Sequence, residues 1–258
     1  MKFGTIASGS SGNCLYAGHG DAHILIDAGI SCKRIIEGLN SFKLEGKDIQ
    51  GILVTHEHTD HVSGLGVLAR KFHIPIYGTE KTLRQLLTMN NLGKIDKDLL
   101  FVVEPDKVYS IGGMEIEPFS ISHDAADPVS YILHDNGKKV GMVTDLGYYD
   151  QRIVSKLKDS DLLYVEANHD IHMVQVGSYP YYLKRRILGD QGHLCNEKAA
   201  ELVVELSNDR LKRVILGHLS KENNYPDLAL RTVRNEVEAS IDVEVAPRDY
   251  AGILYDLG

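Results

Sequence analysis

Short apolar runs alternate with amphipathic stretches along this chain, and the alternation predicts a protein built from strands and helices. Residues 2–8, 14–17 and 22–26 are apolar segments of strand length, separated by Gly-rich turns. Residues 52–54 form another buried-type strand, and Ser31 precedes apolar residues at helical spacing. Strands that alternate with helices are typical of the α/β class, in which helices pack on the faces of sheets.

The same alternation continues to the end of the chain. We expect helices over 61–71, 79–91, 196–206 and 226–239. We expect strands over 74–77, 119–123, 129–134, 139–143, 162–166 and 211–216. Weak patterns predict two hairpins within 100–118 and a closing hairpin from 243–245 and 253–255.

Composition narrows the class of protein. A length of 258 residues with 43% hydrophobic content predicts one sizeable domain over 1–258. No apolar run is long enough to cross a membrane, and the first residues lack a signal peptide's apolar region. Three cysteines without CxxC spacing indicate a reducing compartment. We therefore expect a soluble, cytoplasmic protein with no membrane partner.

The densest group of potential metal ligands is His-Glu-His-Thr-Asp-His, at residues 56–61, directly after the strand 52–54. His56 and His58 are two apart, so in an extended backbone both rings leave the same face. Asp60 and His61 follow where a helix is expected to begin. Two pairs of ligands in six residues suit two divalent ions better than one, and this order favours a metal site over a solvated His-rich loop.

Two other segments each leave two interpretations open. Residues 8–13 are Ser, Gly and Asn, and such a loop could cradle an anion or form a hairpin turn, which the loop alone favours. Residues 179–182 and 184–186 combine aromatic and basic side chains, which could bind nucleic acid or form a solvated helix. The formal net charge of −8 counts against a nucleic-acid partner, but bound divalent ions would reverse the sign locally.

Residues 55–61 resemble the metal-binding signature of the metallo-β-lactamase superfamily. The resemblance implies a four-layer αββα sandwich, with two sheets face to face and helices outside. It also implies Asp27 as a hydrogen-bond acceptor that braces the metal loop. The ligands it implies are His56, His58 and His123 for one ion, Asp60, His61 and His218 for the other, and Asp145 as a bridge between them.

Other motifs indicate a branch of that superfamily. Glu166 and the Gly192-His193 pair resemble those of tRNase Z-type phosphodiesterases, in which the histidine assists the leaving oxygen or stabilises phosphate and the glutamate orients it. A longer set of segments resembles the YycJ/WalJ family, although Cys195 stands where Ser is expected. These segments are 7–13, 25–31, 55–61, 166–170, 192–194 and 218–224. The resemblance implies a 5′→3′ exonuclease that acts on double-stranded DNA.

The resulting hypothesis is a two-metal phosphodiesterase, with zinc, manganese or iron as the metal. Asp60, His193 and Glu166 are the expected catalytic residues. Candidate substrate-binding residues are His169, Lys184, Arg185 and Arg186. A thioesterase or lactonase that uses the same metals is the main alternative, and a non-enzymatic regulator of a cell-wall two-component system is the other. The sequence does not define the oligomeric state.

Overall fold

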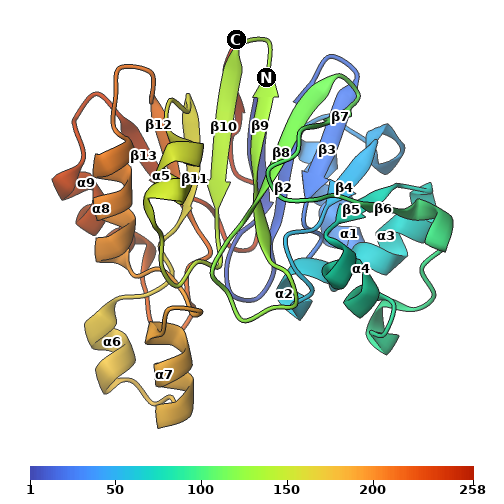
Figure 1. Ribbon diagram of the computed structural model, residues 1–258. Helices are drawn as coiled ribbons and strands as arrows, with labels where there is room; N and C mark the ends of the chain where they lie inside the picture. The colour runs from blue at the N-terminus through green and yellow to red at the C-terminus, as the bar shows by residue number, and fades with distance from the viewer. The chain divides into compact units, whose positions relative to one another are not determined.

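The computed structural model describes residues 1–258, and the chain divides into two compact units (Figure 1). The first unit comprises Met1–Ser120, Ala125–Lys138 and Pro247–Gly258. The second comprises Ile121–Asp124 and Lys139–Ala246. One domain over the whole chain stays a prediction. None of the helices has the length and apolar character needed to cross a membrane.

The first unit contains a seven-stranded mixed sheet. The strand order is β14-β1-β2-β3-β4-β5-β6, antiparallel from β14 to β3 and parallel from β3 to β6. The strands are β1 (Lys2–Ala7), β2 (Cys14–His19), β3 (Ala22–Ile26), β4 (Gly51–Leu53), β5 (Ile76–Gly78), β6 (Leu100–Val102) and β14 (Leu254–Asp256). The Gly-rich turns predicted between the first three strands give the antiparallel meander.

Helices connect the parallel strands, as crossover connections require. Ser31 caps the first of them through its side chain, which accepts from the Arg34 N–H at 3.4 Å. The connecting helices are α1 (Cys32–Ser41), α2 (Thr59–Val62), α3 (Leu65–Phe72) and α4 (Glu80–Leu86), with 3₁₀ turns at Gly46–Asp48, Asn90–Leu92 and Lys97–Leu99.

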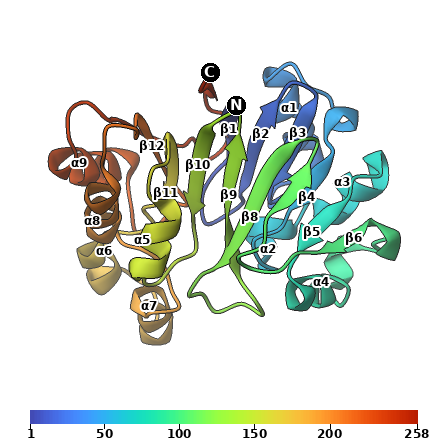
Figure 2. The same cartoon turned by 45° about the horizontal axis from the view of Figure 1, so that its top comes forward.

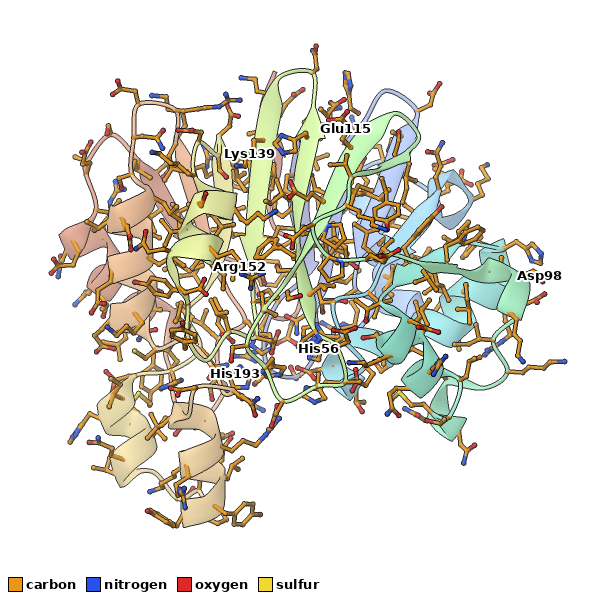
Figure 3. The ribbon with its side chains drawn as sticks, in the orientation of Figure 1. His56, Asp98, Glu115, Lys139, Arg152 and His193 are labelled. Carbon is orange, nitrogen blue, oxygen red and sulfur yellow. The ribbon has the colours of Figure 1, made fainter.

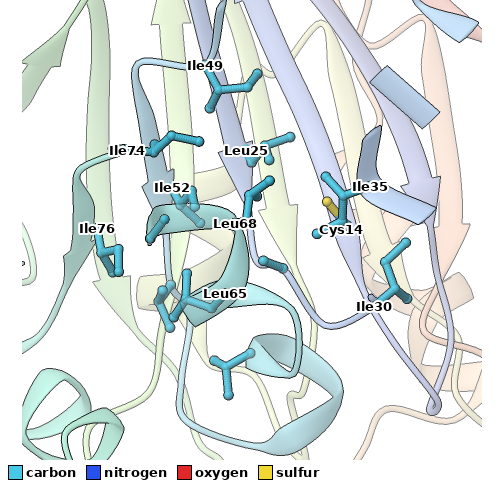
Figure 4. Packing of buried hydrophobic residues seen from close by; sticks show 14 of the residues in the cluster. Cys14, Leu25, Ile30, Ile35, Ile49, Ile52, Leu65, Leu68, Ile74 and Ile76 are labelled. Carbon is cyan, nitrogen blue, oxygen red and sulfur yellow. The ribbon is translucent and has the colours of Figure 1, made fainter. Parts of the chain in front are cut away.

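A hydrophobic core lies between this sheet and helices α1 and α3. Leu25 of β3 and Ile52 of β4 are fully buried in the same cluster as Ile35 of α1 and Leu68 of α3 (Figure 4). This packing fixes the carboxyl end of β4, from which the His-rich motif begins. Tyr131 adds a polar anchor at that point, because its hydroxyl donates to the Val54 carbonyl at 2.8 Å.

Three further strands of the first unit form an antiparallel set, β7-β8-β9. They are β7 (Tyr109–Ile111), β8 (Met114–Ser120) and β9 (Val129–Asp135). The turn after β9 contains Asn136 at φ 48° and Gly137 at φ 75°, residue types that tolerate the left-handed conformation. The prediction of two hairpins within 100–118 is wrong, because β6 pairs in parallel with β5 and only β7 and β8 form a hairpin.

The second unit has four parallel strands, in the order β10-β11-β12-β13. Helices α5, α8 and α9 lie side by side along them, and α6 and α7 lie beyond the end to which the arrowhead of β10 points (Figures 1 and 2). The elements are β10 (Lys138–Val143), β11 (Leu162–Glu166), β12 (Arg213–Gly217), β13 (Asp242–Val245), α5 (Gln151–Leu157), α6 (Ile171–Val176), α7 (Tyr181–Leu188), α8 (Asn196–Leu206) and α9 (Pro226–Glu236).

Two further expectations are corrected. The closing hairpin is wrong, because β13 pairs with β12 and β14 pairs with β1. The helix expected over 61–71 is broken into α2 and α3 near Gly64. The Gly64 N–H donates to the Ala28 carbonyl at 2.8 Å, and a Cβ there would lie 2.0 Å from the Ile30 carbonyl oxygen. The chain therefore breaks the helix to dock against the segment after β3.

Gly29 offers a test of this close docking. Gly29→Ala should lower the free energy of unfolding by about 1–3 kcal/mol or more, because the new Cβ would lie 1.7 Å from the backbone oxygen of Asp60. Chemical denaturation measures the effect. Gly78→Ala is the matched control, since its nearest contact is the flexible Leu83 side chain at 3.2 Å. Equal stability of the two variants would contradict the close approach.

Candidate metal centre

The His-rich motif of the first unit gathers its side chains at the carboxyl end of β4. The rings of His56 and His58 have centroids 4.6 Å apart, and those of His56 and His61 are 4.2 Å apart. The His61 Nε2 atom lies 3.5 Å from the Asp60 carboxylate. His56, labelled in Figure 3, and His61 are buried, whereas His58 and Asp60 are partly exposed. The motif therefore brings four metal-ligand side chains together.

Asp27 braces this group from the end of β3. Its two carboxylate oxygens accept from the Thr55 N–H at 2.9 Å and the Thr55 hydroxyl at 2.8 Å. The same carboxylate lies 2.7 Å from the Nδ1 atom of His61. An Nδ1–H that donates to a carboxylate leaves Nε2 as the metal-binding atom. This geometry supports the bracing role expected of Asp27.

Asn13 also contacts this group of side chains, although it was not among the predicted site residues. Its amide nitrogen lies 3.2 Å from His61 Nε2, and its backbone N–H donates to the Asp60 carbonyl at 2.8 Å. Its amide oxygen accepts from the Gly9 N–H at 3.0 Å. Residues 8–13 connect antiparallel strands β1 and β2, and the Gly9, Gly12 and Asn13 N–H groups are all hydrogen-bonded. The geometry favours the hairpin over an anion cradle. The only signal in the sequence was the asparagine at the end of this loop.

The second unit carries a group of its own, Asp145, Glu166, His193 and His218. Their potential ligand atoms all lie within 4.8 Å of one another. Asp145 follows β10, Glu166 ends β11 and His218 follows β12. The carboxyl ends of parallel strands meet at one edge of a sheet, which brings these three side chains together. His193 joins them from the loop between α7 and α8 (Figure 3).

Glu166 is the centre of this second group. One carboxylate oxygen lies 2.9 Å from Nδ1 of both His193 and His218, and the other accepts from the Leu146 N–H at 3.0 Å and the Leu194 N–H at 2.9 Å. Burial alone would raise the pKa of this carboxyl, but the charges and hydrogen bonds of His193 and His218 lower it to about 2. Sequence reasoning linked Glu166 to His193 and missed its contact with His218.

His123 and Asp145 lie close together in the same unit. His123 Nδ1 lies 3.1 Å from the Gly192 carbonyl, to which it can donate, and Nε2 lies 3.8 Å from Asp145 Oδ1. The other Asp145 oxygen accepts from the Thr144 hydroxyl at 2.8 Å. Thus the Gly192-His193 pair has two roles, since the backbone of Gly192 holds His123 and the side chain of His193 contacts Glu166.

Buried asparagines fix the loop that carries His218. The Asn168 amide donates to the His218 carbonyl at 2.9 Å. The Asn224 amide donates to the Ala167 carbonyl at 2.9 Å and to the Asn196 side chain at 2.8 Å. Except for Asn196, these residues belong to the segments 166–170 and 218–224, which the sequence singled out only by resemblance. The structure gives them a physical role, because buried amides with several partners hold loops in one conformation.

The remaining predicted site residues lie in different environments. His169 is buried outside the four-residue group, and burial lowers its pKa to about 4. Arg186 forms a two-point ion pair with Asp124, next to His123. Lys184 donates to the Gln175 carbonyl at 2.7 Å, and Arg185 is exposed. Burial raises the pKa of the Cys195 thiol to about 11, which disfavours a thiolate ligand.

Comparison with known proteins defines the class. The family model described as Beta-lactamase superfamily domain matches residues 22–219. PqqB of Methylobacterium extorquens has the same fold, with a TM-score of 0.76 at 16% identity over all of both chains. The YhfI protein of Bacillus subtilis gives 0.73 at 18% identity over 97% of this chain and 98% of that one. The chain is thus a metallo-β-lactamase superfamily protein, and the predicted fold class is confirmed.

Relatives at higher identity define the family within that class. Exodeoxyribonuclease YycJ of Bacillus anthracis is 42% identical over 92% of this chain and 89% of that protein. Exodeoxyribonuclease WalJ of Streptococcus pneumoniae is 40% identical over 95% of this chain and 91% of that one. The chain belongs to the YycJ/WalJ exodeoxyribonuclease family, as its motifs indicated. It is an exodeoxyribonuclease-like metallohydrolase with His and Asp side chains clustered for metal binding.

The Asp27 brace can be tested by Asp27→Asn. Asparagine tolerates the positive φ of 61° at this position, but its single amide oxygen cannot replace both carboxylate oxygens, which together contact the Thr55 N–H, the Thr55 hydroxyl and His61. Divalent-metal affinity should fall about 10- to 100-fold, the usual effect of losing such a partner. Competition with a chelator measures it. Asp21→Asn, at an exposed acid, should leave the affinity unchanged. Equal affinity of Asp27→Asn and the parent would refute the bracing role.

Proposed function

We propose that the protein is a two-metal phosphodiesterase that removes nucleotides from the 5′ ends of double-stranded DNA in the cytoplasm. Its YycJ/WalJ relatives are exodeoxyribonucleases by name. The observation that carries the proposal is Glu166 holding His193 at 2.9 Å. A histidine fixed by a buried carboxylate suits proton transfer to a leaving oxygen or stabilisation of phosphate.

The proposed metal ligands are the seven that the family resemblance implies: His56, His58, Asp60, His61, His123, Asp145 and His218. The residues present fit divalent cations, because Nδ1 of His61 and of His123 faces an acceptor and Nε2 is the nitrogen that can bind a metal. At His61 the metal would replace the contact of Nε2 with the Asn13 amide at 3.2 Å. Nitrogen and carboxylate donors suit zinc, manganese or iron. When bound, such ions activate water at neutral pH and neutralise charge on phosphate oxygens.

His193 is the residue of its group best placed to meet a substrate. Its side chain is 13% exposed, whereas those of Asp145, Glu166 and His218 are at most 2% exposed. Nδ1 is occupied by Glu166, so Nε2 is the atom that can face a ligand. When the His193 ring is protonated, Nε2–H gives its proton to the oxygen that leaves phosphorus. The Nδ1–H group keeps its hydrogen bond to the Glu166 carboxylate. The carboxylate stabilises the cation before transfer.

Asp60 has the complementary role in the first unit. Its carboxylate is 26% exposed and lies on the short helix α2 within the His-rich motif. An accessible carboxylate at this place can accept the proton that the attacking water loses, besides ligating metal. Of the four expected phosphate contacts, we assign this role to Lys184 and Arg185. His169 is buried and Arg186 is paired with Asp124, so we assign these two a supporting role beside the substrate.

A thioesterase or lactonase is the second candidate, since the same metal ligands can act on a carbonyl group. Such an enzyme does not require a Glu166 and His193 pair or a basic, Tyr-rich helix. Both features therefore favour a phosphodiester substrate. A purely regulatory protein is disfavoured, because the chain belongs to a family of metallohydrolases.

His193→Ala should keep both metal ions and lower DNA hydrolysis by about 10²–10⁴-fold, the range for a positioned proton-transfer group. Bis-nitrophenyl phosphate, whose leaving group needs little protonation, should lose much less if His193 is an acid. Both rates would be measured at equal metal loading. His73→Asn, at an exposed histidine of the first unit where asparagine tolerates the φ of 60°, is the control. No loss on either substrate would remove the argument for a phosphodiesterase.

Metal content provides a separate test. Asp145→Ala should release both ions, because Asp145 is the proposed shared ligand, whereas His218→Ala should empty mainly one site. Elemental analysis of protein dialysed against limiting metal distinguishes these outcomes. Glu166→Gln should also weaken metal binding, because the carboxylate lies 2.9 Å from His218 Nδ1. Two ions per chain in Asp145→Ala would show the bridging assignment to be wrong.

A further inference from the structure

The segment 171–188, which forms α6 and α7, has an unusual charge. It contains Lys184, Arg185 and Arg186 but no Asp or Glu, in a chain with 36 acidic residues and a formal net charge of −8. Asp170, the cap of α6, lies just outside it and accepts from the Met173 N–H at 2.7 Å. A stretch without acidic residues in an acidic protein suits an anionic partner.

The surface of the segment 171–188 also carries exposed aromatic rings. Tyr181 is 76% exposed and Tyr182 is 74% exposed, although most large apolar side chains of the protein are buried. A groove of about 540 Å³ opens beside Tyr181. It is lined by Gln175, Tyr179, Tyr181, Lys184, Arg185 and Leu188. The groove therefore combines aromatic faces with two cations.

Helix α7 connects this groove to the segment of the same unit that carries His123. Arg186, at its carboxyl-terminal half, pairs with Asp124, the neighbour of His123. Tyr181 lies five residues earlier, or about 7–8 Å along the helix axis. His193 and α7 belong to the same unit, so a DNA strand that ends near His193 could extend along α7. The three cations thus differ, because Arg186 holds a loop while Lys184 and Arg185 line the groove.

We propose that this groove binds the unpaired nucleotides of a DNA end, a specificity that rests on the nuclease function proposed above. Inside a duplex both faces of every base are covered by its neighbours, so, apart from the one open face of the terminal pair, an exposed tyrosine ring can stack only on an unpaired base. The cations beside it neutralise the phosphates of the same strand. The protein should therefore favour duplexes with a single-stranded extension over blunt ones.

The test compares a blunt duplex with the same duplex carrying a single-stranded extension at either its 5′ or its 3′ end. Binding to the metal-loaded protein is measured by fluorescence anisotropy on DNA with hydrolysis-resistant linkages. Tyr181→Ala should weaken binding of one extended duplex about tenfold and leave the blunt duplex unchanged, as loss of one stacked base predicts. Tyr181→Phe should bind as the parent does, because the ring remains.

Two controls separate stacking from charge. Lys184→Gln with Arg185→Gln should weaken binding of the extended duplex and flatten its salt dependence, whereas Lys81→Gln with Arg84→Gln, the same charge change on α4, should not. Tyr250→Ala removes an equally exposed ring elsewhere. The proposal would be overturned if the parent protein bound blunt and extended duplexes with equal affinity. It would also be overturned if Tyr181→Ala lowered the affinity for both duplexes equally. Absence of DNA cleavage with the binding preference intact would instead refute the nuclease function.

Discussion

One buried carboxylate, that of Glu166, determines the geometry of the group of potential metal ligands in the second unit. It makes four contacts of 2.9–3.0 Å, two with histidine rings and two with backbone N–H groups. A buried charge is tolerated only when such partners replace water. Because the same oxygen contacts His193 and His218, a proposed metal ligand and a proposed catalytic group share one support. Their ring orientations are coupled, so neither can rotate without the loss of a charged hydrogen bond.

In both units, a left-handed backbone conformation places functional residues at the ends of strands. Asp27, Asp145 and His218 each follow a strand and have φ of 61°, 56° and 55°. The left-handed region is unfavourable for residues other than glycine, by about 1–3 kcal/mol in strained cases. At each position side-chain or backbone hydrogen bonds offset that cost, for example from Thr55 to Asp27 and from Asn168 to His218. A sharp turn at a strand end directs the functional side chain away from the strand without a long loop.

The sequence predicted the local elements better than their partners. The first three strands, the Ser31-capped helix and the helix 196–206 were predicted correctly because turns, caps and helical spacing are local signals. The pairing of β13 with β12 and of β14 with β1 was missed, since it depends on contacts far apart in the sequence. Metal-type residues were recognised by motif. Among their supports, Asp27 and the link of Glu166 to His193 were expected from the resemblance. Asn13 and the contact of Glu166 with His218 were found only in the structure, because they carry no spacing pattern.

The basic helix shows why residue type alone could not assign a role. Lys184, Arg185 and Arg186 are consecutive, yet helical geometry turns each by about 100° from the next, so they meet different surroundings. Arg186 faces Asp124, and a planar guanidinium paired at two points with a carboxylate is held in one orientation. The Arg186 guanidinium therefore mainly holds the segment beside His123 in place. An anionic ligand on α7 would meet chiefly Lys184 and Arg185. Two cations orient a strand well only when aromatic faces hold its bases as well.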